Sequence, residues 1–211
     1  VAVSGDDSVP PPDAPSLTLN TDSGVNNDGV SNQGGITVAG LDSTDPASTW
    51  EYSLDGGSNW QAGQGNSISV TAEGSYSVVA RQTVGGQVSE SSVSLSVTVD
   101  QTPATLVSLA TSAADQTISV TYDSEMLESG SPATSAFTVR QGGAELVLDS
   151  VSVSGAVVTL SVTGLASGSL QVSYEAPGDA ASAIQDNVGN LPVSFSQIVV
   201  SDGYIRGAEV Y

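Results

Sequence analysis

The sequence predicts an all-β protein, and three features carry this prediction. Short segments alternate apolar and polar residues with period two, as a strand with one buried face requires. Turn signals rich in glycine, aspartate and asparagine separate them, and no window of useful length shows the apolar stripe of a helix. The clearest alternating segments are residues 93–99, 118–122, 157–162 and 170–174, and the turn signals are Asp55-Gly56-Gly57, Gly85-Gly86, Gly142-Gly143, Ser154-Gly155 and Asn187-Val188-Gly189-Asn190.

A recurring junction divides the chain into domains. Three alternating segments end in the acidic residues Asp6, Asp100 and Asp202, and the first two continue into links that contain proline. The junctions are spaced by roughly 100 residues, the length of one immunoglobulin-like sandwich. We therefore expect two tandem immunoglobulin-like β-sandwich domains. The expected divisions are residues 1–15 as the tail of a preceding domain and a linker, 16–100 and 101–201 as the two sandwiches, and 202–211 as the start of a next domain.

The charge balance excludes several classes of function. The chain has 23 acidic residues against three basic ones, Arg81, Arg140 and Arg206, and its formal net charge is -20. Nucleic-acid binding needs clustered Lys or Arg, and an anionic membrane surface repels such a chain, so we expect neither partner. No apolar run approaches the ~18 residues of a membrane span, so we expect no membrane insertion. Hydrophobic residues still make up 38% of the chain, and this content predicts a folded protein.

The missing residue types exclude most catalytic chemistry. Because the chain has no His, Cys or Lys, it cannot form a Ser-His-Asp triad, an ordinary zinc site or a P-loop. Only carboxylate chemistry remains, either a glycosidase-type acid pair or a site for a hard cation. Glu125 and Glu128 stand three residues apart in a loop with no aromatic or basic neighbour, which favours solvated acids or metal ligands over catalysis. We expect no enzyme activity.

Both domains resemble repeats of giant RTX-type adhesins, which bacteria secrete by the type I route. The first domain is similar to their bacterial immunoglobulin-like repeat, and the matching residues are 21–24, Asp28-Gly29, 36–41, 50–60 and 99–103. The second domain looks like a SwmB-type repeat, and its matching residues are 122–127, 137–139, 172–174 and 186–190. The first domain departs from the pattern at residues 84–87, where many such repeats carry an Asp-containing turn. The resemblance implies a secreted or cell-surface location, bound calcium, and a role in adhesion or biofilms.

Strand directions predict where the acidic residues lie. In a sandwich of seven strands, A to G, the A–B, C–D and E–F loops share the end at which strand G leaves. Asp22, Asp28, Asp55, Glu73 and Asp100 therefore share the exit end of the first domain. Asp123, Glu125, Glu128, Asp179 and Asp186 share the entry end of the second. The predicted ligands of a calcium site at this junction are Asp22, Asp28, Asp55, Asp100, Asp123 and Asp186, because converging carboxylates repel one another without a cation.

Simpler interpretations stay open for these residues. Surface turns are rich in Asp, and an acidic surface keeps a protein soluble in salt. A weaker acidic cluster is expected at the entry end of the first domain, from Asp6, Asp7, Asp13, Asp42 and Asp45. Trp50 and Trp60 fit a sandwich core better than a sugar platform, although both are open. We expect Arg81 and Arg140 to pair with nearby carboxylates.

The favoured function is a calcium-stabilised spacer that holds a ligand-binding module of the same adhesin away from the cell. An alternative is a calcium-assisted binding module, with residues 175–191 as its surface and a peptide or glycan of the host or biofilm as its ligand. A third is an accessory domain of a secreted polysaccharide-degrading enzyme. The expected partners are neighbouring repeats of the same chain, and we expect a monomer.

Overall fold

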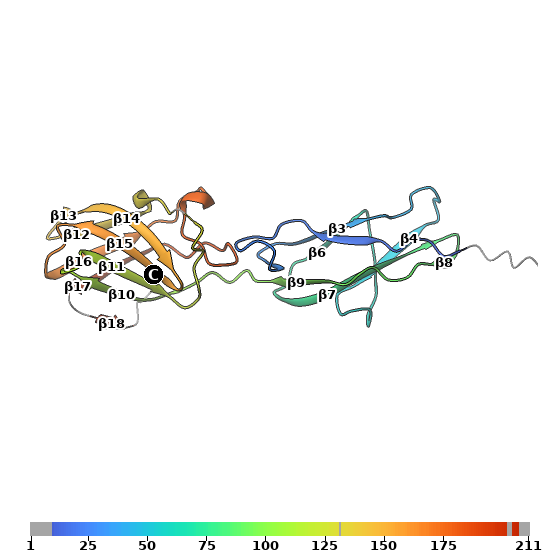
Figure 1. The fold of residues 1–211 in the computed structure, drawn as a ribbon, viewed down its shortest axis with the longest axis horizontal. Coiled ribbons are helices and arrows are strands. Elements are labelled where there is room, and N and C mark those ends of the chain that lie inside the picture. Colours follow the sequence, from blue (N-terminus) through green and yellow to red (C-terminus); the bar gives the residue numbers. More distant parts are fainter. Residues whose placement is uncertain (1–9, 131, 202–203, 207–211) are drawn as a thin grey trace, which may run out of the picture. The chain divides into compact units, whose positions relative to one another are not determined.

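The prediction of an all-β chain is confirmed. The computed structural model describes residues 10–130, 132–201 and 204–206, and their helices are two three-residue 3-10 turns, η1 (Thr134–Ala136) and η2 (Ala180–Ser182). No helix among these residues has the length and hydropathy to span a bilayer. The chain forms two compact units, Val1–Asp100 and Gln101–Tyr211, and each is a β-sandwich (Figure 1).

The described part of unit 1 has two facing sheets (Figure 1). The smaller sheet has the order β1-β3-β6, formed by β1 (Ser16–Leu19), β3 (Gly34–Ala39) and β6 (Ser67–Val70). The larger has the order β2-β9-β7-β4-β5, formed by β2 (Val30–Ser31), β9 (Leu95–Val99), β7 (Gly74–Val84), β4 (Thr49–Ser53) and β5 (Gln61–Ala62), with β8 (Gln87–Val88) beside β7. All pairs are antiparallel except β2 and β9, which run parallel.

Every second residue of the strands in unit 1 faces the space between the sheets, because side chains alternate along a strand. These buried residues form one apolar core: Ile36, Val38, Ile68, Val70, Val78, Ala80, Val97 and Val99. Trp50 and Tyr52 of β4 pack against this core, and their rings lie 5.9 Å apart.

The chain leaves unit 1 at the end opposite to its entry. The Ser31 hydroxyl donates to the carbonyl of Thr21, just after β1, while the Ser31 carbonyl accepts the N–H of Asp100, just after β9. The first and last strands therefore finish at the same end. At the other end, before β1, the carbonyl of Asp13 accepts a hydrogen bond from Gln82 of β7.

The last strand of unit 1 begins later than the alternation predicted. The pattern starts at Val93, but β9 starts at Leu95, and the Val93 side chain is 90% exposed. The Ser92 hydroxyl accepts the N–H of Ala80, and the Ser92 N–H donates to the Ala80 carbonyl. Ser92 thus holds the segment before β9 through its side chain, and Val93 points to solvent.

Unit 2 also has two sheets. One has the order β14-β15-β11-β10-β18, formed by β14 (Val147–Ser154), β15 (Val157–Thr163), β11 (Thr117–Tyr122), β10 (Leu106–Ser112) and β18 (Tyr204–Arg206). The other has the order β13-β12-β16-β17, formed by β13 (Ala144–Glu145), β12 (Phe137–Gln141), β16 (Gly168–Tyr174) and β17 (Phe195–Ser201). All of these pairings are antiparallel.

The core of unit 2 is larger than that of unit 1 and includes aromatic rings. The rings of Phe137 and Phe195 flank that of Tyr174, at centroid distances of 5.0 and 6.0 Å. Tyr122 and Met126 are buried in the same cluster. In the register, Leu106 of β10 lies opposite Tyr122, and Phe195 of β17 opposite Tyr174.

The first strand of unit 2 and its last sandwich strand begin at the same end. The side-chain amide of Asn190, just before β17, donates to the carbonyl of Thr102, just before β10. At the far end, Ser201 of β17 lies opposite Gly168. Unit 2 therefore also has its entry and the end of β17 at opposite ends.

Candidate functional site

Two of the predicted calcium ligands lie in the loop between β1 and β2. The Asp22 carboxylate accepts the N–H of Asn27 at 2.6 Å, and the Asp28 carboxylate accepts the N–H of Val30 at 2.8 Å. Such short-range bonds are typical of aspartates that shape turns. The second carboxylate oxygen of Asp22, Oδ1, is buried, and no donor among the described residues reaches it.

Asp55 organises the turn between β4 and β5. Its carboxylate accepts the side-chain amide of Asn59 at 2.5 Å, the Ser53 hydroxyl at 2.6 Å and the N–H of Asn59 at 2.8 Å. These donors, the Asn59 side chain first, lower the pKa of Asp55 to about 2, because they stabilise the charged form. Asp55 is therefore an anion that already has several partners within its own turn.

Asp100 follows β9 directly. Its N–H donates to the Ser31 carbonyl at 3.0 Å, which places it beside the end of the loop that carries Asp22 and Asp28. Four of the predicted ligands thus come from the end of unit 1 at which β1, β4 and β9 finish: Asp22, Asp28, Asp55 and Asp100.

The acidic residues of unit 2 surround its entry segment. The Asp123 carboxylate accepts both the N–H of Thr105, at 2.7 Å, and the Thr105 hydroxyl. These bonds, the hydroxyl first, lower the pKa of Asp123. Glu125 contacts Asn187 through its carboxylate at 3.2 Å, and Glu128 accepts the N–H of Gly155 at 2.7 Å. Their carboxylates thus face separate amide donors.

Asp186 is buried and closes the long loop before β17. Its Oδ1 accepts the N–H groups of Val188 and Asn190, each at 2.9 Å, while its own N–H donates to the Asn190 carbonyl. Asp179 similarly accepts the N–H of Ala181 and the Ser182 hydroxyl. The loop 175–191, predicted as a binding surface, is therefore organised by its own aspartates.

The predicted calcium site takes ligands from both units. Among the described residues, no three Asp or Glu side chains are grouped closely enough to hold a metal ion by themselves. Because the structure describes each unit by itself, a site that shares ligands between them stays a prediction.

The weaker acidic cluster at the entry end of unit 1 is only partly described, since Asp6 and Asp7 lie outside the described residues. The Asp42 carboxylate accepts the hydroxyl and the N–H of Thr44, and these bonds lower its pKa. Asp45 instead joins two loops, because it accepts the N–H groups of Ala47 and Gly85. Asp13 contributes its backbone carbonyl to Gln82.

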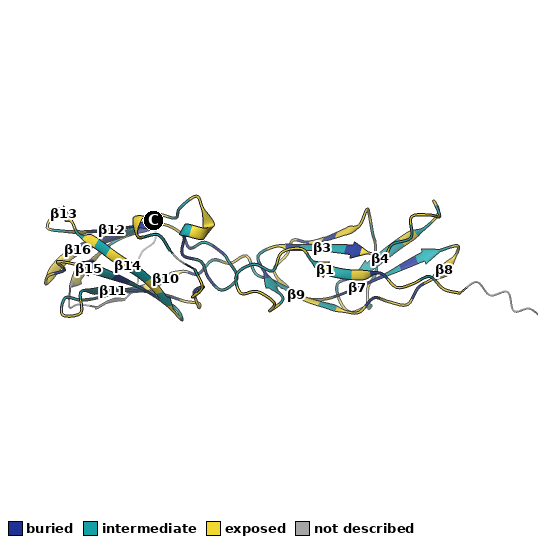
Figure 2. Cartoon of the chain, turned by 45° about the horizontal axis from the view of Figure 1, so that its top comes forward, coloured by how far each residue is buried: buried dark blue, intermediate teal, exposed yellow. Residues whose placement is uncertain are grey.

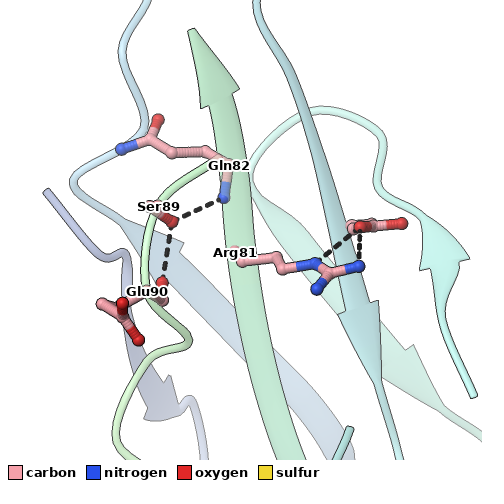
Figure 3. A network of polar contacts seen from close by, with 5 residues as sticks. Arg81, Gln82, Ser89 and Glu90 are labelled. Atoms are coloured by element: carbon pink, nitrogen blue, oxygen red, sulfur yellow. Dashed lines mark hydrogen bonds and ion pairs between the residues drawn. The ribbon is translucent and has the colours of Figure 1, made fainter. Parts of the chain in front are cut away.

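Gln82 is a residue that the sequence analysis missed. It occupies an inward position of β7 and is 3% exposed. Its amide donates to the carbonyls of Asp13 and Gly40 and accepts the N–H of Asp42, while its own N–H donates to the Ser89 hydroxyl (Figure 3). A polar residue two positions after Val78 and Ala80 is the signal that could have indicated this role.

The arginines pair with carboxylates as predicted. Arg81 lies 2.6 Å from Glu51, and Arg140 lies 2.9 Å from Glu145. Figure 3 shows the Arg81 guanidinium extended on the face of β7 away from the Gln82 network. The guanidinium also stacks on Trp60, 4.0 Å from the ring centroid. Trp60 is therefore a partner of Arg81, whereas Trp50 packs against the core.

The sheets of both units define the class of protein as tandem β-sandwich modules. No protein-family model matches the chain, and no curated protein matches it. Among solved structures, the chain is similar to the fibronectin(III)-like modules of CbhA from Clostridium thermocellum, with 14% identity, a TM-score of 0.38, and coverage of 88% of this chain and 93% of that chain. It is also similar to the FN1–FN3 domains of chicken CNTN1, with 12% identity, a TM-score of 0.35, and coverage of 91% of this chain and 67% of that chain.

Proposed function

We propose that the chain is a calcium-stabilised spacer of a large secreted bacterial surface adhesin and has no catalytic role. The observation that carries this proposal is the path of the chain through each sandwich. Each unit receives the chain at one end, and its last sandwich strand finishes at the opposite end. A module with this path adds length when it is repeated along a chain. Strands of five to eight residues, rising about 3.3 Å per residue, give ~20 Å of strand per module before the loops are counted.

The adhesin context rests on the resemblance of the sequence motifs. In unit 1 the motif from Trp50 to Trp60 forms β4 and the turn that Asp55 organises. In unit 2 the motif from Asp186 to Asn190 forms the closed turn before β17. Both motifs thus occupy structurally defined positions in their sandwiches. This supports the proposed membership of the two repeat types and, with it, a location on the cell surface.

The calcium proposal is supported by the chemistry at the exit end of unit 1. A buried carboxylate oxygen without a donor is unfavourable, because it has lost water and gained no partner. Asp22 Oδ1 is such an oxygen, and a hard cation is the partner that suits it. Asp22 would be the first ligand, with Asp28, Asp55 and Asp100 as further ligands at this end and Asp123 and Asp186 as the ligands proposed from unit 2. Calcium would supply positive charge that lowers the repulsion among these carboxylates.

We predict that calcium raises the melting temperature of the protein and that Asp22→Asn removes most of this increase. At a calcium concentration ~100-fold above the dissociation constant, one site would add about 2.7 kcal/mol to the free energy of unfolding. Differential scanning calorimetry with calcium or with a chelator measures the effect. Asp115→Asn is the matched control, because Asp115 lies in an exposed turn of unit 2 and accepts the Ser112 hydroxyl.

The proposed site fails if wild type melts alike with calcium and with the chelator. It also fails at Asp22 if the Asp22→Asn and Asp115→Asn variants respond to calcium equally. A magnesium series separates a calcium site from general screening of a highly acidic chain, since screening does not discriminate between the two ions.

A further inference from the structure

Unit 2 has an opening on one side of its sandwich, where the chain passes from one sheet to the other. β13 pairs only with Arg140 and Gln141 of β12, and one further bond joins the Leu146 N–H to the Val139 carbonyl at 2.9 Å. After Leu146 the chain leaves β12 and continues as β14, in the opposite sheet. This fork leaves a groove of about 390 Å³, whose lining includes Phe137, Thr138, Val139, Leu146, Val147 and Leu148.

Backbone groups of β12 face this groove. The Val139 carbonyl is directed to the side of β13, because it accepts the Leu146 N–H. In an antiparallel strand the N–H and C=O of one residue point to the same side, and every second residue repeats the direction. The Val139 N–H and the Phe137 carbonyl therefore point into the groove. No strand among the described residues pairs with Phe137 or Thr138 on this side.

The groove also exposes apolar side chains. The Val147 side chain is 64% exposed, while Leu146 and Leu148 are partly buried. Figure 2 shows exposed and half-buried residues along β14, which is the outer strand of its sheet among the described residues. An unpaired backbone edge beside exposed apolar side chains is the surface to which an extended peptide adds as a strand.

The charge around the groove indicates what kind of segment fits. Glu145 lines the groove and its side chain is 60% exposed, although it pairs with Arg140. The exposed Asp149 follows Leu148 on β14. A second copy of this chain, with its own net charge of -20, would be repelled. A basic or neutral segment is complementary to these carboxylates.

We propose that this groove binds an extended, basic peptide segment of a partner protein by strand addition to β12. An apolar side chain of the segment packs against Leu146 and Val147, and a cationic side chain lies near Glu145. The segment that touches Phe137–Val139 spans about three residues, or ~10 Å. This binding needs no calcium and is independent of the spacer function, so that a spacer unit also attaches a second protein along its length.

The probe is a synthetic acetylated and amidated peptide of the sequence Lys-Val-Thr-Val-Lys, titrated into isotope-labelled full-length protein in the presence of a chelator. We expect amide chemical-shift changes at Thr138, Val139 and residues 146–148. Replacing both Lys by Glu removes the charge complementarity, and replacing the central Thr by Pro removes a backbone N–H. Both changes should weaken binding. A pattern of shifts that omits the groove, or no shift at millimolar peptide, would overturn the proposal.

The decisive protein variant is Val147→Asp, with Val193→Asp as its matched control. Both valines are similarly exposed, 64% and 62%, and only Val147 lines the groove. Val147→Asp should weaken peptide binding about tenfold, because one apolar contact is lost. Val193→Asp should leave binding unchanged. Equal effects of the two variants would overturn the site. A dimer in sedimentation equilibrium that Val147→Asp dissociates would identify a second copy as the occupant and overturn the basic segment.

Discussion

Gly63 sets the position of the Trp50 ring in unit 1. It follows β5, and its N–H donates to the Trp50 carbonyl at 2.8 Å. A Cβ atom at Gly63 would lie 2.1 Å from Cε2 of the Trp50 ring. The backbone of Gly63 therefore lies directly on the indole, whose Nε1–H donates to the Gly65 carbonyl. This contact explains why Trp50 packs against the core and does not present its face to a ligand.

We predict that Gly63→Ala lowers the free energy of unfolding of unit 1 by about 1–3 kcal/mol, because the added methyl group displaces a large ring. The melting temperature should fall by several degrees, as differential scanning calorimetry can measure. Gly35→Ala is the control, since its Cβ would meet the end of the movable Asn20 side chain at 3.1 Å. Equal losses for the two variants would contradict the proposed contact.

At the scale of elements, β11 and β16 bury tyrosine hydroxyls at their ends. Tyr122 is 3% exposed and Tyr174 is 1% exposed. The Tyr122 hydroxyl has no hydrogen-bond partner among the described residues. Burial raises the pKa of Tyr122 well above its usual range, and the neighbouring Tyr174 adds to this increase. Burial likewise raises the pKa of Tyr174. The ends of these two strands therefore depend on both phenols being neutral.

We predict that the stability of unit 2 falls as the pH rises above about 10, where an unfolded tyrosine loses its proton and the folded Tyr122 does not. Below that pH the contribution is complete. Tyr122→Phe should reduce this alkaline loss and leave stability at neutral pH unchanged or slightly higher, because it removes a hydroxyl without a partner. Urea unfolding at several pH values measures both effects. An alkaline loss of the same size in the variant would assign it to other groups.

At the scale of the whole molecule, unit 1 ends at Asp100 and unit 2 begins at Gln101. Neither core includes Asp100. Calcium that bound at Asp100 together with ligands from both units would restrict the motion of one unit against the other. The stiffness of the proposed spacer would then depend on this residue, while the fold of each sandwich would not.

We predict that calcium changes the small-angle scattering profile of wild type in the direction of a stiffer chain, and that Asp100→Ala abolishes this response. The circular dichroism spectra of the two proteins should stay alike, because neither sandwich needs this carboxylate to fold. Asp115→Ala serves as the charge control and should respond like wild type. A wild-type profile that is the same with calcium and with a chelator would reject the stiff spacer.

Local patterns of the sequence are sufficient to predict several features of this protein. Period-two alternation identifies strands such as β11, β15 and β16, because one face of each is buried and the other is wet. Turn residues such as Asp55-Gly56-Gly57 and Gly142-Gly143 mark where strands reverse. The lack of His, Cys and Lys limits the chemistry of the chain whatever its fold, because no arrangement of strands can supply a missing side chain.

Only the tertiary structure decides which distant residues meet. The parallel pairing of β2 with β9 joins segments far apart in sequence, and no local pattern indicates it. The same holds for Gln82, whose partners Asp13 and Gly40 come from other elements. The buried Oδ1 of Asp22 and the groove beside Val139 also depend on where neighbouring segments pack. The physical reason is that alternation reports burial of a face, whereas pairing, orphaned oxygens and open edges depend on contacts between segments that the sequence separates.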